Sequence, residues 1–216
     1  MKRKLQITGK GMLAVAPDII ILSFIASSQE WEYEKTVSAL NEKVEELRVI
    51  LEQEGIERAN LKTKDFSIRK ETVWDKKAEK YEFNGFKASH NLELELPLEK
   101  ALINSLLSQI ANRLDNLDFS ISFGVKDASA HQQQLILQAI AKAKENASLI
   151  AEATGVTLME IIDIDYSYRE LTIRSQRYDY PVYEADMLMT TADAAPDFEP
   201  DDIDVAETVT ITWRIE

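Results

Sequence analysis

The sequence contains no cysteine and only two histidines among its 216 residues. The absence of cysteine excludes disulfide bonds, thiolate metal sites and a cysteine nucleophile. Two histidines, His90 and His131, are too few for a histidine-rich metal cage. The apolar run from Ile19 to Ala26 is far shorter than the roughly 20 residues that a membrane helix needs. We therefore expect no membrane span.

Positive charge is scarce near the C-terminal end of the sequence. The chain carries 25 Lys and Arg against 38 Asp and Glu, which gives a net charge of −13. Ten acidic residues and no Lys or Arg lie between Tyr178 and Trp213, whereas residues 1–177 have a net charge of −3. Nucleic-acid binding requires a basic footprint that releases counterions. The sequence supplies none, so we expect nucleic acid not to be a partner.

The first residues resemble the start of a signal peptide, because Lys2, Arg3 and Lys4 follow the initial methionine. Gly9, Gly11 and the Pro17-Asp18 pair, however, interrupt the segment that should form a continuous apolar region. We interpret this segment as two strands and expect a cytoplasmic location. A periplasmic or cell-surface location is the alternative if a leader has been trimmed.

Hydrophobic periodicity predicts about seven strands and about three helices. Period-two alternation and short apolar runs place the strands at 5–16, 19–28, 61–74, 81–96, 119–125, 158–169 and 205–215. Apolar stripes at three- and four-residue spacing place helices at 34–54, from Pro97 to about 112, and from Asp127 or Ser129 to Gly155. We expect a bend in the fourth strand near Asn84-Gly85.

This order of elements predicts an α+β fold. The connections are of both hairpin and crossover type, which favours a mixed or mostly antiparallel sheet with the helices packed on it in a two-layer sandwich. An arrangement in two α/β lobes is the alternative. We expect a single domain over 1–216, with a smaller lobe at about 98–165 as a further option.

The segment 174–204 shows little periodicity and holds most of the excess acidic charge, so we interpret it as an acidic, tyrosine-rich loop or arm. Aromatic side chains near charge are typical of protein interfaces. We therefore predict contact from about Tyr178 to Met189, with the alternative that these residues, like the strand residues Tyr166 and Tyr168, only cover the chain's own sheet. The candidate interface residues are Tyr178, Tyr180, Tyr183, Met187 and Leu188.

The two histidines and a glycine pair are the other candidates for chemistry. His90 falls on the apolar face of a strand and is interpreted as a hydrogen-bonded core histidine, and His131 as an exposed residue in the first turn of a helix. Gly9-Lys10-Gly11 resembles the start of a phosphate loop but lacks the third glycine and the following helix. A strand bulge or a turn explains these glycines better.

Acidic residues suggest two further sites, and neither pattern is complete. Glu184 and Asp186 form a surface pair without a pocket. A run in the acidic segment offers oxygen ligands for calcium but lacks the glycine and the spaced glutamate of an EF-hand loop; its members are Asp197, Glu199, Asp201, Asp202 and Asp204. We therefore assign no catalytic, cofactor-binding or metal-binding residue and expect no cofactor.

Several short motifs, taken in order, resemble the SIMPL-domain family of bacterial proteins of unknown function, which are related to periplasmic immunogenic and oxidative-stress-associated proteins. The motifs are Ile7-Thr8-Gly9-Lys10-Gly11, Val15-Ala16-Pro17-Asp18, Gly85-Phe86-Lys87-Ala88-Ser89, Ile121-Ser122-Phe123, and the closing Pro200, Ile203, Val209, Ile211 and Trp213. The resemblance covers nearly the whole chain. It implies one SIMPL-like domain and an oligomer-forming, stress-linked or partner-binding role, and it transfers no catalytic residue.

These observations together predict a non-enzymatic interaction or assembly protein. Its sheet edges and tyrosine-rich segment would build a homo-oligomer or receive a protein partner. The alternative is a small-molecule or calcium-binding module, or a cryptic enzyme, with a pocket between the sheet and the loop.

Overall fold

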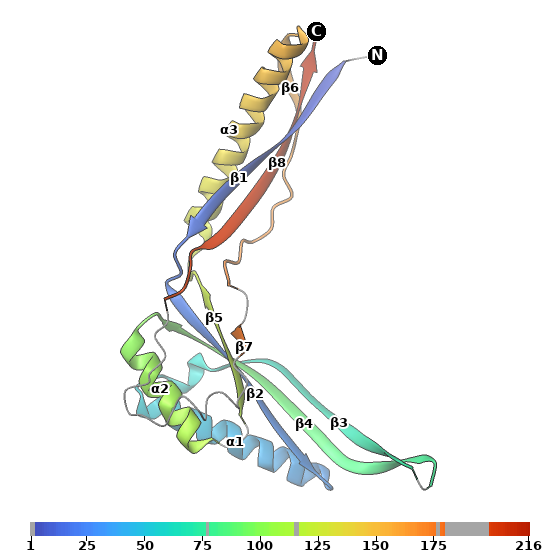
Figure 1. Ribbon diagram of the computed structural model, residues 1–216, viewed down its shortest axis with the longest axis vertical. Coiled ribbons are helices and arrows are strands. Elements are labelled where there is room, and N and C mark those ends of the chain that lie inside the picture. The colour runs from blue at the N-terminus through green and yellow to red at the C-terminus, as the bar shows by residue number, and fades with distance from the viewer. Residues whose placement is uncertain (1–2, 77, 115–116, 176–177, 180–198) are drawn as a thin grey trace. The chain divides into compact units, whose positions relative to one another are not determined.

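The computed structural model describes residues 3–76, 78–114, 117–175, 178–179 and 199–216, with only the backbone of 178–179 (Figure 1). The chain divides into two compact units. Unit 1 comprises Met1–Pro17, Gly124–Ser175 and Pro200–Glu216, and unit 2 comprises Asp18–Phe123 and Gln176–Glu199. Each unit combines a sheet with helices, which confirms the α+β class. The strands are divided between two sheets, the arrangement that the sequence left as its alternative.

Unit 1 is a three-stranded sheet with one long helix on one face. The strands follow the order β1-β8-β6, with β1 at Lys4–Val15, β8 at Ile203–Ile215 and β6 at Leu158–Asp165. Helix α3, Ser129–Thr154, packs mainly on β1 and β8 and much less on β6. Strands β1 and β8 pair antiparallel along their whole length without a shift in register.

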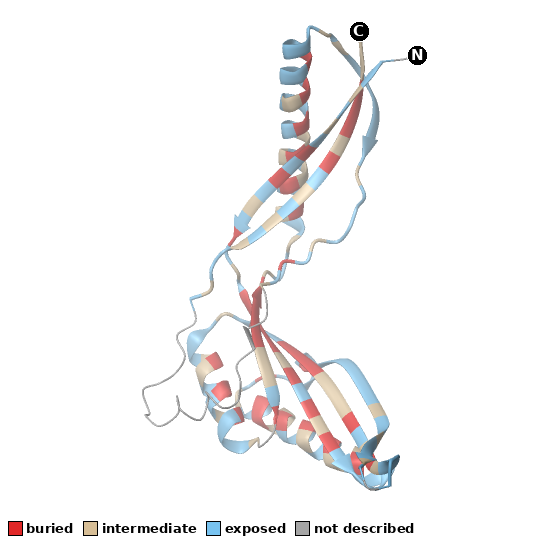
Figure 2. Cartoon of the chain, turned by 45° about the vertical axis from the view of Figure 1, so that its right-hand side comes forward, coloured by how far each residue is buried: buried red, intermediate tan, exposed pale blue. Residues whose placement is uncertain are grey.

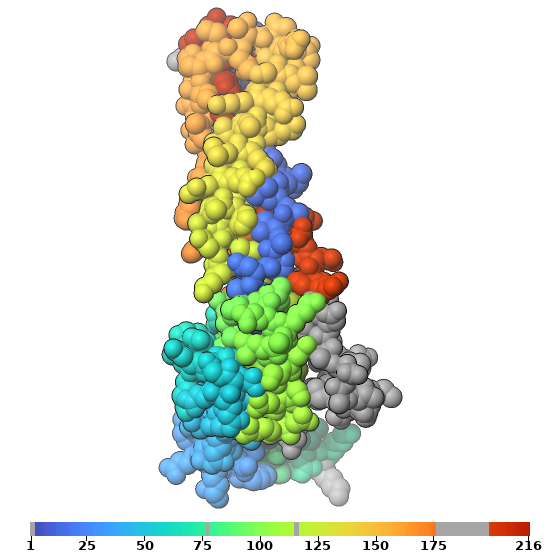
Figure 3. Space-filling model, turned by 90° about the vertical axis from the view of Figure 1, so that its left-hand side faces the viewer, coloured from blue at the N-terminus to red at the C-terminus, as the bar shows by residue number. Residues whose placement is uncertain are grey.

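Small residues bring α3 unusually close to β1. A Cβ atom built on Gly9 would lie 1.9 Å from the carbonyl oxygen of Ala139, and one on Gly11 would lie 2.1 Å from that of Leu135. The matching face of α3 is a buried stripe that includes Ala139 and Ala143. Figure 2 shows this buried side of the helix in red, and Figure 3 shows the yellow atoms of α3 directly against the blue atoms of β1.

The reason for the two glycines therefore differs from the one expected. The uninterrupted pairing of β1 with β8 contradicts a bulge or turn at Gly9-Lys10-Gly11. The glycines instead remove the side chains that would keep the helix at a normal distance from the sheet.

Unit 2 is a five-stranded sheet in the order β3-β4-β2-β5-β7. Helices α1, Tyr33–Gln53, and α2, Lys100–Arg113, and a short 3₁₀ helix at Arg58–Asn60 accompany it. The strands are β2 at Ile19–Glu30, β3 at Lys62–Asp75, β4 at Lys80–Pro97, β5 at Asp118–Gly124 and β7 at Tyr178–Asp179. The pairs β2–β4, β3–β4 and β5–β7 are antiparallel.

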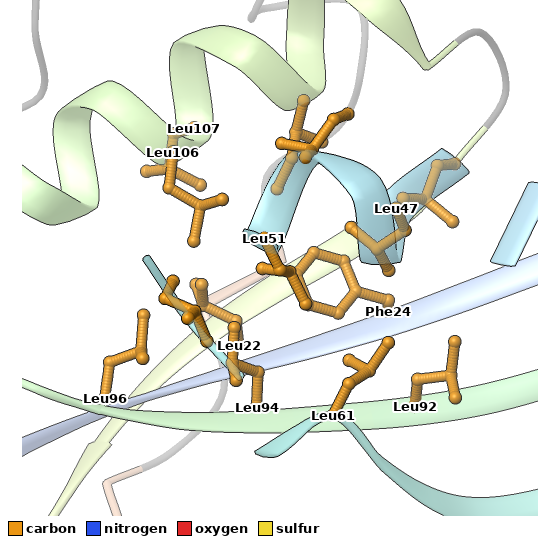
Figure 4. Close-up of a cluster of buried hydrophobic side chains, with 14 of the residues drawn as sticks. Leu22, Phe24, Leu47, Leu51, Leu61, Leu92, Leu94, Leu96, Leu106 and Leu107 are labelled. Atoms are coloured by element: carbon orange, nitrogen blue, oxygen red, sulfur yellow. The ribbon is translucent and has the colours of Figure 1, made fainter. Parts of the chain in front are cut away.

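The core of unit 2 consists mainly of large aliphatic side chains, with the rings of Phe24 and Phe123 among them. Alternate residues of β2, including Leu22 and Phe24, and their partners Leu94 and Leu92 on β4 face the helices. Figure 4 shows the ring of Phe24 between these strands and the leucines of α1. All four strand residues are buried, so large side chains fill the space between the sheet and the helices.

The element boundaries expected from the sequence agree with the structure to within about two residues, with three exceptions. Helix α2 begins at Lys100 and not at Pro97, which is the last residue of β4, and the short strand β7 was not expected.

The third exception is β6. β6 ends at Asp165, so Tyr166 and Tyr168 lie beyond it and the strand expected to continue to Arg169 is too long. Gln132 of α3 supplies the reason, because its side-chain amide donates to the carbonyl oxygen of Arg169 at 2.6 Å and draws this segment to the helix. Within the described ranges, no helix is both long and apolar enough to span a bilayer.

Candidate interaction surface

The interface residues expected from the acidic segment lie almost wholly outside the described residues. Tyr180, Tyr183, Met187 and Leu188 are not described. The backbone of Tyr178 belongs to β7 and pairs with Ile121 of β5, and Asp179 pairs with Ser120. The segment therefore starts as an added strand at the edge of the sheet, and the role of its side chains stays a prediction.

His90 lies on the helix side of β4 and is half-buried. Its Nε2 atom is 2.8 Å from the hydroxyl of Thr63, and its ring packs edge-on against Phe66. Burial, followed by the positive charge of Arg48, lowers the pKa of His90 below its ordinary value of 6.5. The Nδ1 atom is buried without a hydrogen-bond partner, so the expected hydrogen-bonded histidine is found with one of its two nitrogens engaged.

The other sequence candidates do not converge on a site. His131 lies in the first turn of α3, where it is half-buried rather than exposed. Asp201, Asp202 and Asp204 are exposed, while Glu184, Asp186 and Asp197 lie outside the described residues. In the part of the chain that the structure describes, no three His, Asp or Glu side chains are grouped to hold a metal ion.

A group of exposed rings forms the most distinctive surface of unit 2, which we call the aromatic surface. Its members come from the β3–β4 hairpin, from the loop before α1 and from the first turn of α1. The exposed fraction of their side chains ranges from 42% to 71%. Five rings are exposed and a sixth, Phe86, is half-buried beside them. The five exposed members are Trp31, Tyr33, Trp74, Tyr81 and Phe83.

The rings of the aromatic surface contact one another edge to face. The ring centroids lie 5.9 Å apart for Trp31 and Phe83, 5.4 Å for Phe83 and Phe86, and 5.9 Å for Phe86 and Tyr33. Trp74 and Tyr81, cross-strand partners in the hairpin, form a separate pair at 5.0 Å. These are the separations at which aromatic pairs attract, so the rings support each other's orientation.

A bulge in β4 brings the hairpin rings to the same face. The register with β3 shifts between the pairs Lys70–Phe86 and Thr72–Phe83, so two residues of β4 face one residue of β3. Gly85 occupies the bulge with a φ of +91°, and a Cβ atom there would lie 2.5 Å from the carbonyl oxygen of Glu30. Only glycine fits this position without strain, so Gly85 lets the hairpin approach the loop that carries Trp31.

Hydrogen bonds fix the loop that carries Trp31. The hydroxyl of Thr36 donates to the carbonyl oxygen of Glu32 at 2.9 Å, and the hydroxyl of Ser28 donates to the carbonyl oxygen of Thr36 at 2.7 Å. The side-chain amide of Gln29 donates to the carbonyl oxygen of Asn84 at 2.9 Å and ties β2 to the bulge. Trp31 is therefore held in place while its ring remains exposed.

The hairpin that carries the aromatic surface differs in charge from the rest of the chain. Residues 62–87 contain eight Lys and Arg against five Asp and Glu, a net charge of +3 in a chain of −13. Lys70, Lys76 and Lys80 are exposed, and Lys80 pairs with Glu82 at 3.1 Å. Around Trp31 the charge is instead acidic, with Glu30 and Glu32 on either side. Positive charge is therefore concentrated on the hairpin.

A second exposed apolar group lies on β6 of unit 1, and we call it the isoleucine strand. Ile161, Ile162 and Ile164 are 41–56% exposed because α3 covers little of this edge strand. Figure 2 shows the strand in pale blue almost throughout. Residues 158–165 include Glu160, Asp163 and Asp165 and no Lys or Arg. The strand therefore combines exposed isoleucines with three acidic residues, of which Glu160 pairs with Arg214 of β8 at 3.1 Å.

Unit 1 also has a shallow hollow of about 540 Å³ on β1 and β8. Its lining includes the charged side chains Lys10 and Asp204 among apolar residues; the rest are Met12, Leu13, Ala14, Val205 and Ala206. Met12 is largely exposed, and only two adjacent strands supply the walls. The hollow is thus an open surface feature of the sheet.

Comparison with known proteins places both units in one family. The family model described as "SIMPL: Protein of unknown function (DUF541)" matches residues 5–213. The chain belongs to the SIMPL family. The SIMPL match spans both units, and the resemblance noted in the sequence is confirmed.

Two curated proteins are similar to this SIMPL chain at lower identity. Each is a "26 kDa periplasmic immunogenic protein", one from Brucella melitensis biotype 1 and one from Brucella abortus strain S19. Both are 25% identical to the chain over 164 residues, which is 74% of this chain. The match covers 65% of the relatives' own length, just under two thirds.

Sequence reasoning missed the aromatic surface because its residues are far apart in the chain. The hairpin rings are neighbours in the sequence, at Trp74, Tyr81, Phe83 and Phe86, whereas Trp31 and Tyr33 lie at the start of α1, more than 40 residues earlier. One signal was available, since two of the three tryptophans lie within highly charged, turn-like stretches and not in apolar runs. Tryptophan in such surroundings indicates a ring left at the surface.

Proposed function

We propose that this SIMPL-family chain is a non-enzymatic interaction protein that assembles with copies of itself or binds a protein partner. The aromatic surface is the observation that carries the proposal. Soluble proteins rarely expose a contiguous apolar patch without using it, and Trp and Tyr dominate the binding energy of protein interfaces. Rigid rings that already contact one another lose little conformational entropy when a partner covers them.

The size of the aromatic surface supports this role. A fully buried aromatic side chain contributes about 150–250 Å², so five rings exposed by 42–71% offer on the order of 500 Å². A stable interface takes roughly 800 Å² from each partner. The rings therefore suffice for the centre of an interface whose rim the charged hairpin residues would complete.

The relatives' name supports a periplasmic site for this activity and gives no support to the cytoplasmic location expected from the sequence. We extend that location to this chain as part of the proposal. Fractionation of cells that express the native gene would test it, with the protein expected in the fluid released by osmotic shock. Recovery with the cytoplasmic contents would contradict the location without affecting the interaction role.

Light scattering after size-exclusion chromatography tests the interaction role. A variant with Trp31→Ser and Phe83→Ser should lose self-association, or capture of a defined partner, because both rings belong to the aromatic surface. Leu149→Ala is the matched control, since Leu149 is a similarly exposed apolar side chain on α3 of unit 1. Unchanged association in the double variant, with its circular dichroism spectrum intact, would contradict the proposal.

A small-molecule binding role is the second candidate, favoured by the hollow of about 540 Å³ on unit 1. Ligand sites commonly have volumes of ~300–1,000 Å³. A thermal-shift screen with metabolites and Ca²⁺ separates the two candidates, because a ligand that binds only the folded chain raises its melting temperature. A shift that disappears in a Lys10→Ala, Asp204→Ala variant would favour this second role.

A further inference from the structure

We infer that the closed end of the β3–β4 hairpin docks on the surface of a bilayer that contains anionic phospholipid. The inference goes beyond the proposed function, because the partner is a lipid surface and not a protein. It concerns the separate ring pair Trp74 and Tyr81 and the turn between them.

The closed end of the hairpin is a two-stranded arm that extends beyond the rest of its sheet. β2 pairs with β4 only as far as Glu30 and Phe86, whereas β3 and β4 continue to pair as far as Asp75 and Lys80. Among the described residues no third strand pairs with this part of the hairpin, and Figure 1 shows it as a separate arm. The backbone N–H of Ala78 donates to the Asp75 carboxylate at 3.2 Å, which holds the turn in place.

Apolar side chains lie on both sides of this arm. Trp74 and Tyr81 are cross-strand partners on one side, 46% and 71% exposed. Val73 lies on the other side and is 52% exposed. A protein that covers one side leaves the other in water, whereas a bilayer interface surrounds the whole tip. Trp and Tyr are also enriched at that interface, where the ring is apolar and its N–H or O–H group stays hydrated.

The charge of the arm fits an anionic lipid surface. Residues 69–87 contain six Lys and Arg against four Asp and Glu, a net charge of +2 in a chain of −13. Glu71 and Glu82 are each paired with a basic residue of the same hairpin, at 2.9 and 3.1 Å. Lys70 and Lys76 are exposed and have no ion-pair partner in the described part of the chain. Each Lys near an anionic bilayer strengthens binding roughly fivefold.

The acidic segment begins far from the arm. β7, where that segment starts, and β3 lie at opposite edges of the five-stranded sheet. Four strand spacings of about 4.8 Å place these edges roughly 19 Å apart, well over the Debye length of about 8 Å at physiological salt. Glu30 and Glu32 flank Trp31 at the base of the arm. The tip, and not the base, therefore faces the lipid.

The backbone of the arm limits how deeply it enters the bilayer. A two-stranded ribbon leaves the outward N–H and C=O groups of both strands unpaired, and these groups need water or lipid headgroups as partners. Trp74 and Tyr81 therefore lie at the level of the headgroups, and the lysine side chains extend towards the phosphates. The result is attachment to the surface of the bilayer.

Flotation with lipid vesicles tests the inference on the full-length chain. At low salt, binding is expected to vesicles of equal parts phosphatidylglycerol and phosphatidylcholine, and should be at least about tenfold weaker to phosphatidylcholine alone. A variant with Trp74→Thr and Tyr81→Thr should lose binding; threonine is used because it favours strand conformation. Leu137→Ala with Leu149→Ala is the matched control and should bind like the wild type, since both leucines are exposed on α3 of unit 1.

Charge reversal separates the role of the lysines from that of the rings. Lys70→Glu with Lys76→Glu should weaken binding to the anionic vesicles by at least about tenfold. Lys10→Glu with Lys144→Glu changes the net charge equally at exposed positions of unit 1, and its effect should be much smaller. Equal weakening by the two pairs would mean that net charge alone governs binding, and would overturn the inference.

Tryptophan fluorescence identifies the residue that meets the lipid. In a Trp31→Phe variant only Trp74 and Trp213 remain, and Trp213 is buried. Vesicles that contain brominated lipid should quench the emission of this variant. They should leave the emission unchanged when Trp74→Phe is added. Quenching that persists in the double variant would place the lipid elsewhere and contradict docking through the tip.

The outcomes separate this inference from the proposed function. Folded wild type that does not bind anionic vesicles overturns the inference and leaves the protein-interaction role intact. If Trp74→Thr and Tyr81→Thr abolish capture of a protein while vesicles are not bound, the tip belongs to the protein interface, and again only the inference fails. Vesicle binding together with unchanged protein association in the Trp31→Ser, Phe83→Ser variant would support the inference and contradict the proposed function.

Discussion

Units 1 and 2 both pack helices on one face of a sheet, but they use residues of opposite size at the contact. In unit 2 the helices meet the sheet through leucines and Phe24, so the layers are held apart by side-chain volume. In unit 1, α3 packs on β1 at Gly9, Gly11 and buried alanines, and these small residues allow the helix backbone to approach the strand closely. Unit 2 therefore depends on large side chains that fill the space between the layers, whereas unit 1 depends on small residues that let the layers come close.

This difference determines where each unit leaves apolar surface exposed. One helix placed tightly over β1 and β8 cannot also cover β6, so the isoleucines of β6 remain in contact with solvent. In unit 2 the exposed rings lie instead on the β3–β4 hairpin, around the bulge at Gly85, and at the start of α1. Four substitutions test the comparison, and hydrogen exchange measured by mass spectrometry reports on each unit separately.

Phe24→Ala should have the largest effect. The ring is 1% exposed, and removing a buried phenylalanine typically costs about 3–5 kcal/mol of the free energy of unfolding. Exchange should accelerate in β2 and β4 far more than in β1 and β8. Ile25→Ala is the matched control, because its neighbouring side chain is exposed on the opposite face and its loss should be nearly neutral.

Gly9→Ala should have the next largest effect, and it acts by adding one carbon where Phe24→Ala removes six. The new Cβ would meet the backbone of Ala139, so α3 has to shift, at a cost of about 1–3 kcal/mol. Protection should fall in β1 and α3 and remain unchanged in β2. Lys10→Ala, at the exposed position between the two glycines, should leave exchange unaltered, and an equal effect at both positions would contradict close packing.

Gly85→Ala should cost about 1–2 kcal/mol, because alanine is strained at positive φ and its Cβ also meets the carbonyl oxygen of Glu30. Gly155→Ala separates the two causes, since Gly155 has a φ of +70° and no neighbour within 4 Å of the added carbon. Gly85→Ala should therefore be the more destabilising and should also weaken self-association. Equal destabilisation by both would show that the contact with Glu30 contributes nothing.

The smallest effect concerns His90, whose pKa is lowered by burial and by Arg48. The folded chain then binds a proton less readily than the unfolded chain. Stability is therefore fully present above the ordinary pKa of 6.5 and falls as the pH drops below it towards the lowered value. Chemical denaturation at several pH values should show a shallower fall for His90→Gln. Parallel pH dependence in both proteins would remove His90 as the cause.

Local patterns were enough to predict most of the secondary structure. The alternation along β4 and β8 and the stripe of α1 depend on neighbouring residues, and they placed these elements within about two residues of their observed bounds. Helix α3 ends as expected, with Gly155 in the left-handed region. These patterns involve residues close together in the sequence, so they can be recognised without knowledge of the fold.

Features that depend on contacts between distant segments could not be predicted in this way. The division into two sheets, the fit of Gly9 against Ala139 and the meeting of Trp31 with Phe83 each join residues more than 50 positions apart. The early end of β6 likewise follows from Gln132 on another element. The tyrosines of the acidic segment were therefore predicted as the interface, whereas the exposed rings of the structure lie on the hairpin and at the start of α1.

Cysteine cross-linking tests most directly whether the aromatic surface is a site of protein contact. The chain has no cysteine of its own, so Tyr81→Cys introduces a single thiol on the aromatic surface, and Leu149→Cys introduces one at a similarly exposed position on α3. With a short cross-linker that joins a thiol to a neighbouring protein, Tyr81→Cys should be captured in a covalent complex under conditions in which Leu149→Cys remains a single chain. Equal capture of the two variants, or capture of Leu149→Cys alone, would contradict the role of the aromatic surface.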